Sequence, residues 1–171
     1  ATSGFSSGGH LASLAATTTG EKIYTLREET IDLEGSLGNY TSFSSDVNAA
    51  CDWSGPIDLL NMDCGESMKM NPSPEEQLIG APKDGNEDKY ALLSPITFID
   101  KNDPPMYVFH GRKDNVVPFC QGERMFNALQ AAGVESYAVY EENGGHGYAM
   151  YSEENLGKMT SFLDKVRNSK K

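Results

Sequence analysis

The sequence predicts an α/β protein with a mostly parallel sheet, and three features lead to this prediction. Short β-prone runs alternate with helical patterns along the chain, as expected when parallel strands are joined by crossover helices. The run MYVFH at 106–110 lies between a Pro-Pro pair and a glycine and is the clearest strand. An amphipathic pattern over 118–132 follows it, so strand and helix succeed each other as one unit.

The first part of the chain predicts one helix, a polar segment and one strand. Small and apolar residues recur at helical spacing over 7–18, which indicates a tightly packed helix. Residues 19–46 are polar and rich in Gly, Ser and Thr without a sustained period, so we expect little regular structure there. The apolar run VNAACDW at 47–53 ends at the turn sequence SGP, which is typical of a buried strand.

The remaining elements complete a single predicted domain. Prolines recur between about residues 55 and 95, together with short helix candidates at 74–80 and 87–93. We interpret this segment as a cap-like insertion over the edge of the sheet. A further β-prone run spans 137–140. A final amphipathic helix follows, with apolar residues at Leu156, Met159, Phe162, Leu163 and Val166.

The charge and the cysteines of the chain limit the classes of function that it can have. The net charge of −11 would repel phosphate backbones and anionic headgroups, so we expect neither a nucleic acid nor a membrane partner. No run reaches the roughly 18 apolar residues of a membrane span. Cys51, Cys64 and Cys120 are odd in number and lack CxxC spacing, so we predict free, mostly packed thiols and no zinc site.

A nucleophile motif opens the chain. The sequence GFSSG at 4–8 fits G-x-S-x-G, in which Ser6 would lie on a sharp turn between a strand and a helix. We expect glycine at positions 4 and 8 because a Cβ at either would collide with a neighbouring strand or helix. The amide of Ser7 would be the first donor to an oxyanion at the helix N-terminus.

A serine hydroxyl requires a base, and the chain offers three histidines. His10 lies on the helix behind Ser6 and His110 ends the clearest strand, so packing and hydrogen bonding account for both. His146 lies in a glycine-rich loop after the last predicted strand, where it would face the active edge of the sheet. We therefore predict His146 as the base.

The base in turn requires an orienting carboxylate. Asp114 lies in the loop that leaves the clearest strand, from which it could accept a hydrogen bond from one nitrogen of His146. Asp52, near the end of the preceding strand, is an alternative acid. The sequence thus predicts Ser6, Asp114 and His146 as a catalytic set in the order nucleophile, acid, base.

Four blocks together resemble the esterase/lipase branch of the α/β-hydrolases, in particular the bacterial acetylxylan and feruloyl esterase-like group. They are GFSSGGHLASL, VNAACDWSGPIDLL, ALLSPITFIDKNDPPMYVFHGRKDNVVP and EENGGHGY. The resemblance implies Ser6, Asp114 and His146 as the triad, Ser7 as an oxyanion donor, and no metal or organic cofactor. It also implies an acyl-enzyme pathway on small esters or acylated saccharides, with acetyl or feruloyl groups on plant-wall sugars.

The chain departs from this group in front of Ser6. Such hydrolases place several strands, two helices and an HGGG-type loop, which donates the second oxyanion amide, before the nucleophile. None of these precedes Ser6 here, so we expect the C-terminal half of the fold with the N-terminal strands missing and about three full strands left. The open inner edge would be covered by a missing N-terminal half or by self-association.

Two other functions stay open at this point. A prolyl-oligopeptidase-like serine peptidase shares the same order of triad residues. A truncated fragment or subunit with an intact triad and an incomplete pocket would be inactive, because losing one oxyanion donor costs about a hundredfold to a thousandfold in rate.

Overall fold

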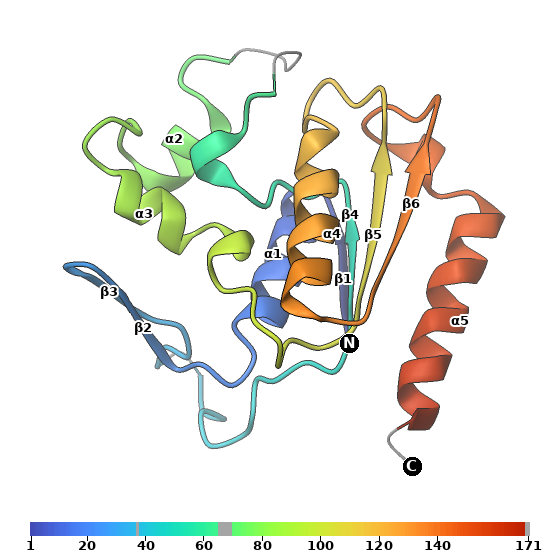
Figure 1. Ribbon diagram of the computed structural model, residues 1–171. Helices are drawn as coiled ribbons and strands as arrows, with labels where there is room; N and C mark the ends of the chain where they lie inside the picture. The colour runs from blue at the N-terminus through green and yellow to red at the C-terminus, as the bar shows by residue number, and fades with distance from the viewer. Residues whose placement is uncertain (37, 65–69, 170–171) are drawn as a thin grey trace.

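The computed structural model describes residues 1–36, 38–64 and 70–169. In these ranges the chain forms a four-stranded parallel sheet in the order β1-β4-β5-β6, with helices on both faces (Figure 1). The predicted α/β class with a mostly parallel sheet is confirmed. The strands are β1 (Thr2–Phe5), β4 (Ala50–Trp53), β5 (Met106–Gly111) and β6 (Ser136–Glu141).

Three longer helices form the outer layers. Helices α1 (Ser7–Thr17) and α4 (Cys120–Ala132) cover one face of the sheet, and α5 (Glu153–Ser169) covers the other (Figure 1). Successive side chains of β5 point to opposite faces of the sheet and contribute to a hydrophobic core on each face. Val108 packs with residues of α1 and α4, and Phe109 packs with residues of α5. This two-sided burial explains why β5 was readable from sequence as an apolar run.

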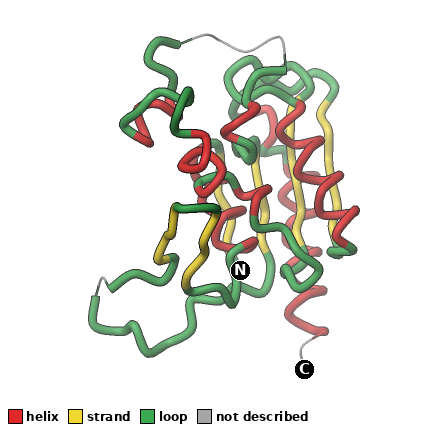
Figure 2. Tube along the Cα trace, turned by 60° about the vertical axis from the view of Figure 1, so that its left-hand side comes forward, coloured by secondary structure: helices red, strands yellow, loops and turns green. Residues whose placement is uncertain are grey.

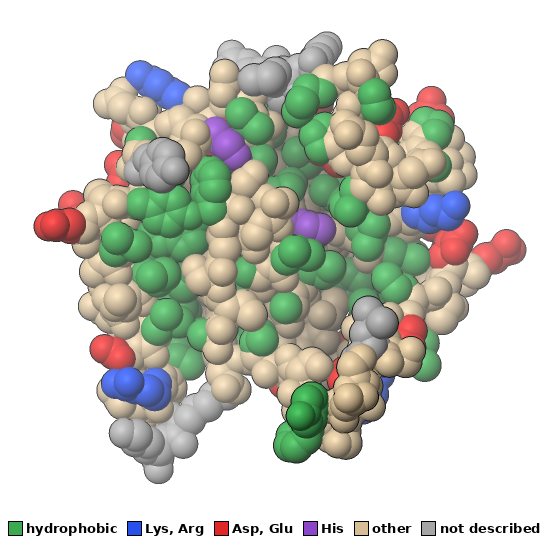
Figure 3. Space-filling view, turned by 180° about the vertical axis from the view of Figure 1, so that it is seen from behind, with side chains coloured by type: hydrophobic (Ala, Val, Ile, Leu, Met, Phe, Trp, Pro, Cys, Tyr) green, Lys and Arg blue, Asp and Glu red, His purple; other side chains and the backbone are tan. Residues whose placement is uncertain are grey.

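The edge strand β1 pairs only with β4 among the described residues. It therefore presents one row of backbone groups without a strand partner. Figure 3 shows the molecule from behind, where hydrophobic side chains gather in the middle of the face and charged side chains lie toward its margins. None of the helices in the described ranges is long and apolar enough to cross a membrane.

The polar segment 19–46 contains more structure than expected. Strands β2 (Ile23–Leu26) and β3 (Glu29–Asp32) form an antiparallel hairpin that projects from the body of the protein (Figure 2). A hydroxyl–hydroxyl bond of 3.0 Å joins Thr25 to Thr30 across the hairpin, and Tyr24 contacts the ring of Phe98. The expectation of little regular structure was wrong here because no residue of the two strands is fully buried, so the sequence carries no sustained apolar alternation to mark them.

The segment between β4 and β5 carries both predicted short helices, α2 (Pro74–Ile79) and α3 (Glu87–Leu92). Helix α2 begins with a capping box, because Ser73 and Glu76 each bond to the other's backbone amide. Two short 3-10 turns, at Leu59–Asn61 and Pro95–Thr97, complete the segment.

The cysteines differ from the prediction in one respect. Cys51 is buried and free, as expected, but Cys64 and Cys120 form a disulfide with a Cα–Cα distance of 6.3 Å. Their separation of 56 residues carries no local signal, and an odd total does not exclude one pair. The disulfide ties the segment after β4 to the start of α4.

Candidate active site

Ser6 lies on the sharp turn between β1 and α1. Its backbone has a positive φ of 56° and ψ of −120°, a conformation that costs free energy for a residue with a side chain. Two backbone bonds hold it there, since the Ser6 amide donates to Trp53 O at 2.8 Å and the His10 amide donates to Ser6 O at 3.0 Å. The turn therefore fixes the hydroxyl at the C-terminal edge of the sheet.

The glycines around Ser6 have unequal roles. A Cβ on Gly4 would collide with the backbone of Gly8, as the sequence predicted, whereas a Cβ on Gly8 would meet nothing in the described chain. The expectation for Gly8 was therefore wrong. The second close approach belongs to Gly9, where a Cβ would meet the carboxylate of Asp52 and the carbonyl of Trp53.

The three predicted catalytic side chains meet in one line of hydrogen bonds. His146 Nε2 lies 3.0 Å from Ser6 Oγ, and His146 Nδ1 lies 2.7 Å from Asp114 Oδ2. Since the carboxylate accepts at Nδ1, the proton resides there and Nε2 is left to accept from the Ser6 hydroxyl. This is the geometry that a general base requires beside a serine nucleophile.

Asp114 is buried and ionised. Its Oδ1 accepts from the amides of Val116 and Val117, each at 2.9 Å. Burial acts to raise the pKa of Asp114, but the hydrogen bonds from His146, Val116 and Val117 outweigh it and hold that pKa below its usual range. The site therefore keeps a carboxylate, rather than a carboxylic acid, against the imidazole.

The loops that carry the acid and the base cross in close contact. A Cβ on Gly111 would collide with the carbonyl of Gly144, so the crossing requires glycine at position 111. The Lys113 amide donates to Gly144 O at 2.8 Å, and the Arg112 amide donates to Glu141 O at 2.9 Å. Backbone bonds between the loops thus set the separation of Asp114 and His146.

An aromatic contact that the sequence did not predict lies against the base. The ring of Phe5 is 4.7 Å from the imidazole of His146, centroid to centroid, and Tyr151 packs on the edge of Phe5. Phe5 is the first variable residue of the G-x-S-x-G motif, and this place is the only sequence signal that could have marked it. The contact limits the directions in which the imidazole can turn.

The other two histidines lie outside the hydrogen-bonded line, as predicted. His10 Nε2 donates to Leu93 O at 2.7 Å, and His110 Nε2 donates to Val117 O at 2.9 Å. Burial lowers the pKa of His110, so this residue is neutral and forms no ion pair with Asp114, although the two lie 3.6 Å apart. The alternative acid Asp52 bonds to the Gly55 amide and has no bond to His146.

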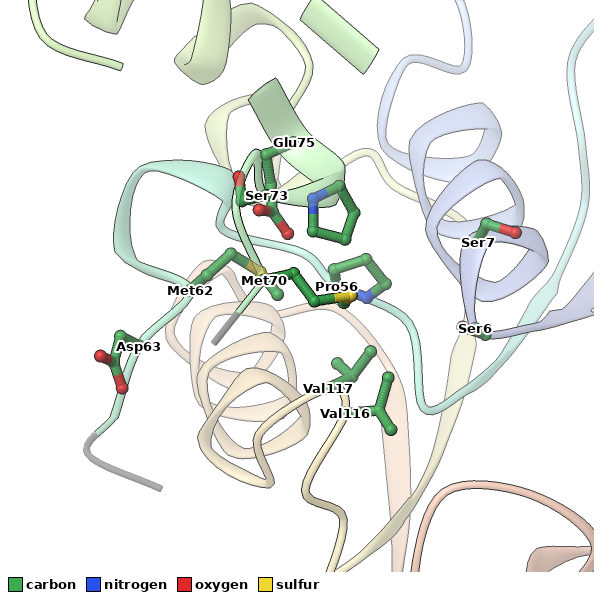
Figure 4. A pocket seen from close by; sticks show the side chains of 11 residues that line it. Ser6, Ser7, Pro56, Met62, Asp63, Met70, Ser73, Glu75, Val116 and Val117 are labelled. Carbon is green, nitrogen blue, oxygen red and sulfur yellow. The ribbon is translucent and has the colours of Figure 1, made fainter. Parts of the chain in front are cut away.

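A pocket of about 390 Å³ opens beside Ser6 (Figure 4). In Figure 4, Pro56, Val116 and Val117 lie between Ser6 and the methionines, and Asp63 lies farthest from Ser6. The pocket thus combines an apolar part near the nucleophile with acidic groups farther out. Its lining residues are Ser6, Ser7, Pro56, Met62, Asp63, Met70, Ser73, Pro74, Glu75, Val116 and Val117.

The described ranges hold no cluster of three or more His, Cys, Asp or Glu side chains with the arrangement of a metal site. The chemistry that this site can support from its own side chains is proton transfer at Ser6 and nucleophilic attack by its oxygen.

Comparison with known proteins places this chain in a family. The BD-FAE family profile matches residues 1–129. The chain is 30% identical to the probable carboxylic ester hydrolase LipM of Mycobacterium tuberculosis over 142 residues, which is 83% of this chain and 30% of that protein.

Two solved structures share the fold. A bifunctional GH43-CE protein of Bacteroides eggerthii superposes with a TM-score of 0.88 at 48% identity, covering 96% of this chain and 23% of its own. A truncated carbohydrate esterase from gut microbiota gives a TM-score of 0.90 at 40% identity, covering 96% of this chain and 58% of its own. The chain therefore spans only part of each of these proteins. It belongs to the BD-FAE family of α/β-hydrolase esterases.

Proposed function

We propose that this chain carries the catalytic residues of a serine carboxylic ester hydrolase. Ser6 is the nucleophile, His146 the general base and Asp114 the acid that orients the base. The observation that carries the proposal is the hydrogen-bonded line from Ser6 through His146 to Asp114, at 3.0 and 2.7 Å. The family membership and the esterase names of the similar proteins support the same function.

The proposed reaction follows from this line of bonds. His146 takes the hydroxyl proton of Ser6 as the serine oxygen attacks the ester carbonyl, and Asp114 stabilises the imidazolium that forms. The Ser7 amide, at the first position of α1 and therefore without a helical acceptor, donates to the oxyanion. The proton then passes to the leaving alcohol, and water releases the acyl group by the same steps in reverse.

We further propose acetyl or feruloyl esters of plant-wall saccharides as the substrates. The similarity to a carbohydrate esterase from gut microbiota, at 40% identity, supports a saccharide ester. The apolar side chains of Pro56, Val116 and Val117 suit an acyl group next to Ser6, and the carboxylates of Asp63 and Glu75 suit sugar hydroxyls.

The wider fold enters the proposal in two places. The segment at about 55–95 acts as a cap, because it supplies Met62, Met70 and Glu75 to the pocket. The free edge of β1 is covered by another part of the hydrolase fold or by a second copy of the chain. The segment that covers this edge supplies the second oxyanion donor. A sample that stays monomeric at high concentration contradicts coverage by a second copy.

The test is turnover of p-nitrophenyl acetate by the wild type, by Ser6→Ala and by Ser161→Ala, a matched change on the exposed side of α5. We expect turnover in the wild type and in Ser161→Ala, and a loss of about 10³-fold or more in Ser6→Ala. Equal turnover in wild type and Ser6→Ala would contradict the nucleophile. Parallel assays with acetylated xylo-oligosaccharides, methyl ferulate and a peptidyl p-nitroanilide separate the esterase from the peptidase.

A further inference from the structure

Gln121 uses both ends of its side-chain amide on one short segment after β4. The side chain is fully buried in the first turn of α4. Its oxygen accepts from the amides of Ile57 and Asp58, each at 2.9 Å. Its nitrogen donates to the carbonyls of Asn61 at 3.0 Å and Met62 at 3.4 Å.

Two other contacts fix the same segment to the same helix. The guanidinium of Arg124, one turn along α4, donates to Asn61 O and lies 3.6 Å from the carboxylate of Asp58. The disulfide between Cys64 and Cys120 closes the far end of the segment. Four backbone groups of 57–62 are therefore bonded from α4, namely the buried amides of Ile57 and Asp58 and the carbonyls of Asn61 and Met62.

The segment held in this way carries one wall of the pocket. Pro56, just before the segment, and Met62, at its end, line the pocket together with Val116 and Val117 from the loop that leads into α4. In Figure 4, Met62 lies farther from Ser6 than the valines do. Met62 therefore belongs to the outer part of the pocket, away from the nucleophile.

We propose that Gln121 is a positioning residue that sets the outer part of the substrate pocket and, with it, the affinity for bulky acyl groups. It acts through the backbone of 57–62 and touches neither the triad nor the substrate. A buried amide that bridges two donors and two acceptors is strict in geometry. An apolar replacement leaves the amides of Ile57 and Asp58 and the carbonyl of Met62 without this partner, while Arg124 still donates to Asn61 O.

The experiment compares Gln121→Met with Gln130→Met, using methyl ferulate and p-nitrophenyl acetate. Gln130 is the control for the same change on the same helix, because it is exposed and its amide bonds to Ser136 at the other end of α4. We expect Gln121→Met to raise the KM for methyl ferulate about tenfold and to leave the KM and kcat for p-nitrophenyl acetate within about threefold. Gln130→Met should leave the KM for methyl ferulate and the KM and kcat for p-nitrophenyl acetate unchanged.

Hydrogen exchange gives a readout that does not depend on turnover. The amides of Ile57 and Asp58 should exchange faster in Gln121→Met and at the wild-type rate in Gln130→Met. If Gln121→Met does not fold, Arg124→Met is the second variant, because it removes the Arg124 contacts with Asn61 and Asp58 in the same segment. We expect it to raise the KM for methyl ferulate by a smaller factor.

The inference rests on the proposed function, and the outcomes separate the two. A wild type that hydrolyses neither ester contradicts the proposed function, while exchange at Ile57 and Asp58 still judges the positioning role. Equal losses on both esters, or unchanged exchange at both amides, would overturn the role of Gln121.

Discussion

Asp52 and Asp114 occupy similar places at the ends of adjacent strands, yet their environments differ. Both carboxyls are buried, at 0% and 5% exposure. Asp114 accepts from three N–H groups, on Val116, Val117 and His146, and its pKa lies below the usual range. Asp52 accepts from the Gly55 amide at Oδ1, while its Oδ2 has no hydrogen-bond partner in the described chain.

The opposite pKa shifts follow from this difference in donors. Burial raises the pKa of Asp52 to about 7, and the Gly55 amide and the nearby Ser13 hydroxyl oppose the shift only in part. At Asp114 the same burial is outweighed by the hydrogen bond from His146 and by the amides of Val116 and Val117, where the loop turns back on its own carboxylate. A buried acid thus stays charged, and can stabilise an imidazolium, only where several N–H groups donate to it.

The largest effect that this comparison predicts is on turnover. Asp114→Asn should lower kcat for p-nitrophenyl acetate by about 10³- to 10⁴-fold, because an amide at this place disfavours the His146 tautomer that accepts from Ser6. Asp52→Asn should change kcat by less than about threefold, since it has no bond to His146. Similar losses in the two variants would show that the assignment of the acid is wrong.

A second prediction concerns Gly9, which packs against the carboxylate of Asp52. Gly9→Ala would drive a Cβ into the Asp52 carboxylate and the Trp53 carbonyl, so we expect a loss of about 1–3 kcal/mol in the free energy of unfolding. Gly8→Ala, one residue earlier in the same helix, meets no atom and should be neutral or stabilising by up to about 1 kcal/mol. Urea denaturation of both variants measures the difference, and equal losses would contradict the close packing at Gly9.

The smallest predicted effect is on the pH dependence of stability. Because the folded pKa of Asp52 is raised to about 7 from an ordinary value near 3.8, the unfolded state loses its proton first. The stability that the neutral carboxyl provides is therefore complete below about pH 4 and is lost as the pH rises to about 7.

Asp52→Asn should consequently reduce the fall in Tm between pH 5 and pH 8 by about 2–4 °C. Part of the fall should remain, since burial also raises the pKa of Asp103 to about 7. Asp103→Asn is the control that removes this part without touching α1. A fall in Tm that is the same in wild type and Asp52→Asn would contradict the raised pKa of Asp52.

Much of the site could be predicted because its signals are local. The G-x-S-x-G motif, one glycine-rich loop after the last strand and one acidic loop after the clearest strand each need only neighbouring residues to be recognised. The fold then brings Ser6, Asp114 and His146 to hydrogen-bond distance. The choice between Asp52 and Asp114 was not local, since it depends on how many donors the folded backbone directs at each carboxyl.

The features that the sequence did not reveal have physical reasons of the same kind. The β2–β3 hairpin has no fully buried residue and no sustained apolar alternation to mark it. The Cys64–Cys120 disulfide and the Gln121 contacts join residues about 60 positions apart, which only the packing of α4 against the segment after β4 brings together.

The most direct test of the proposed site is mass spectrometry after reaction with a fluorophosphonate. The measurement is made on folded wild type, Asp52→Asn and Asp114→Asn, with peptide mapping of the adduct. We expect a single adduct on Ser6 that forms at similar rates in wild type and Asp52→Asn and far more slowly in Asp114→Asn. An adduct elsewhere, no adduct in the folded wild type, or equal rates in all three proteins would contradict the proposed triad.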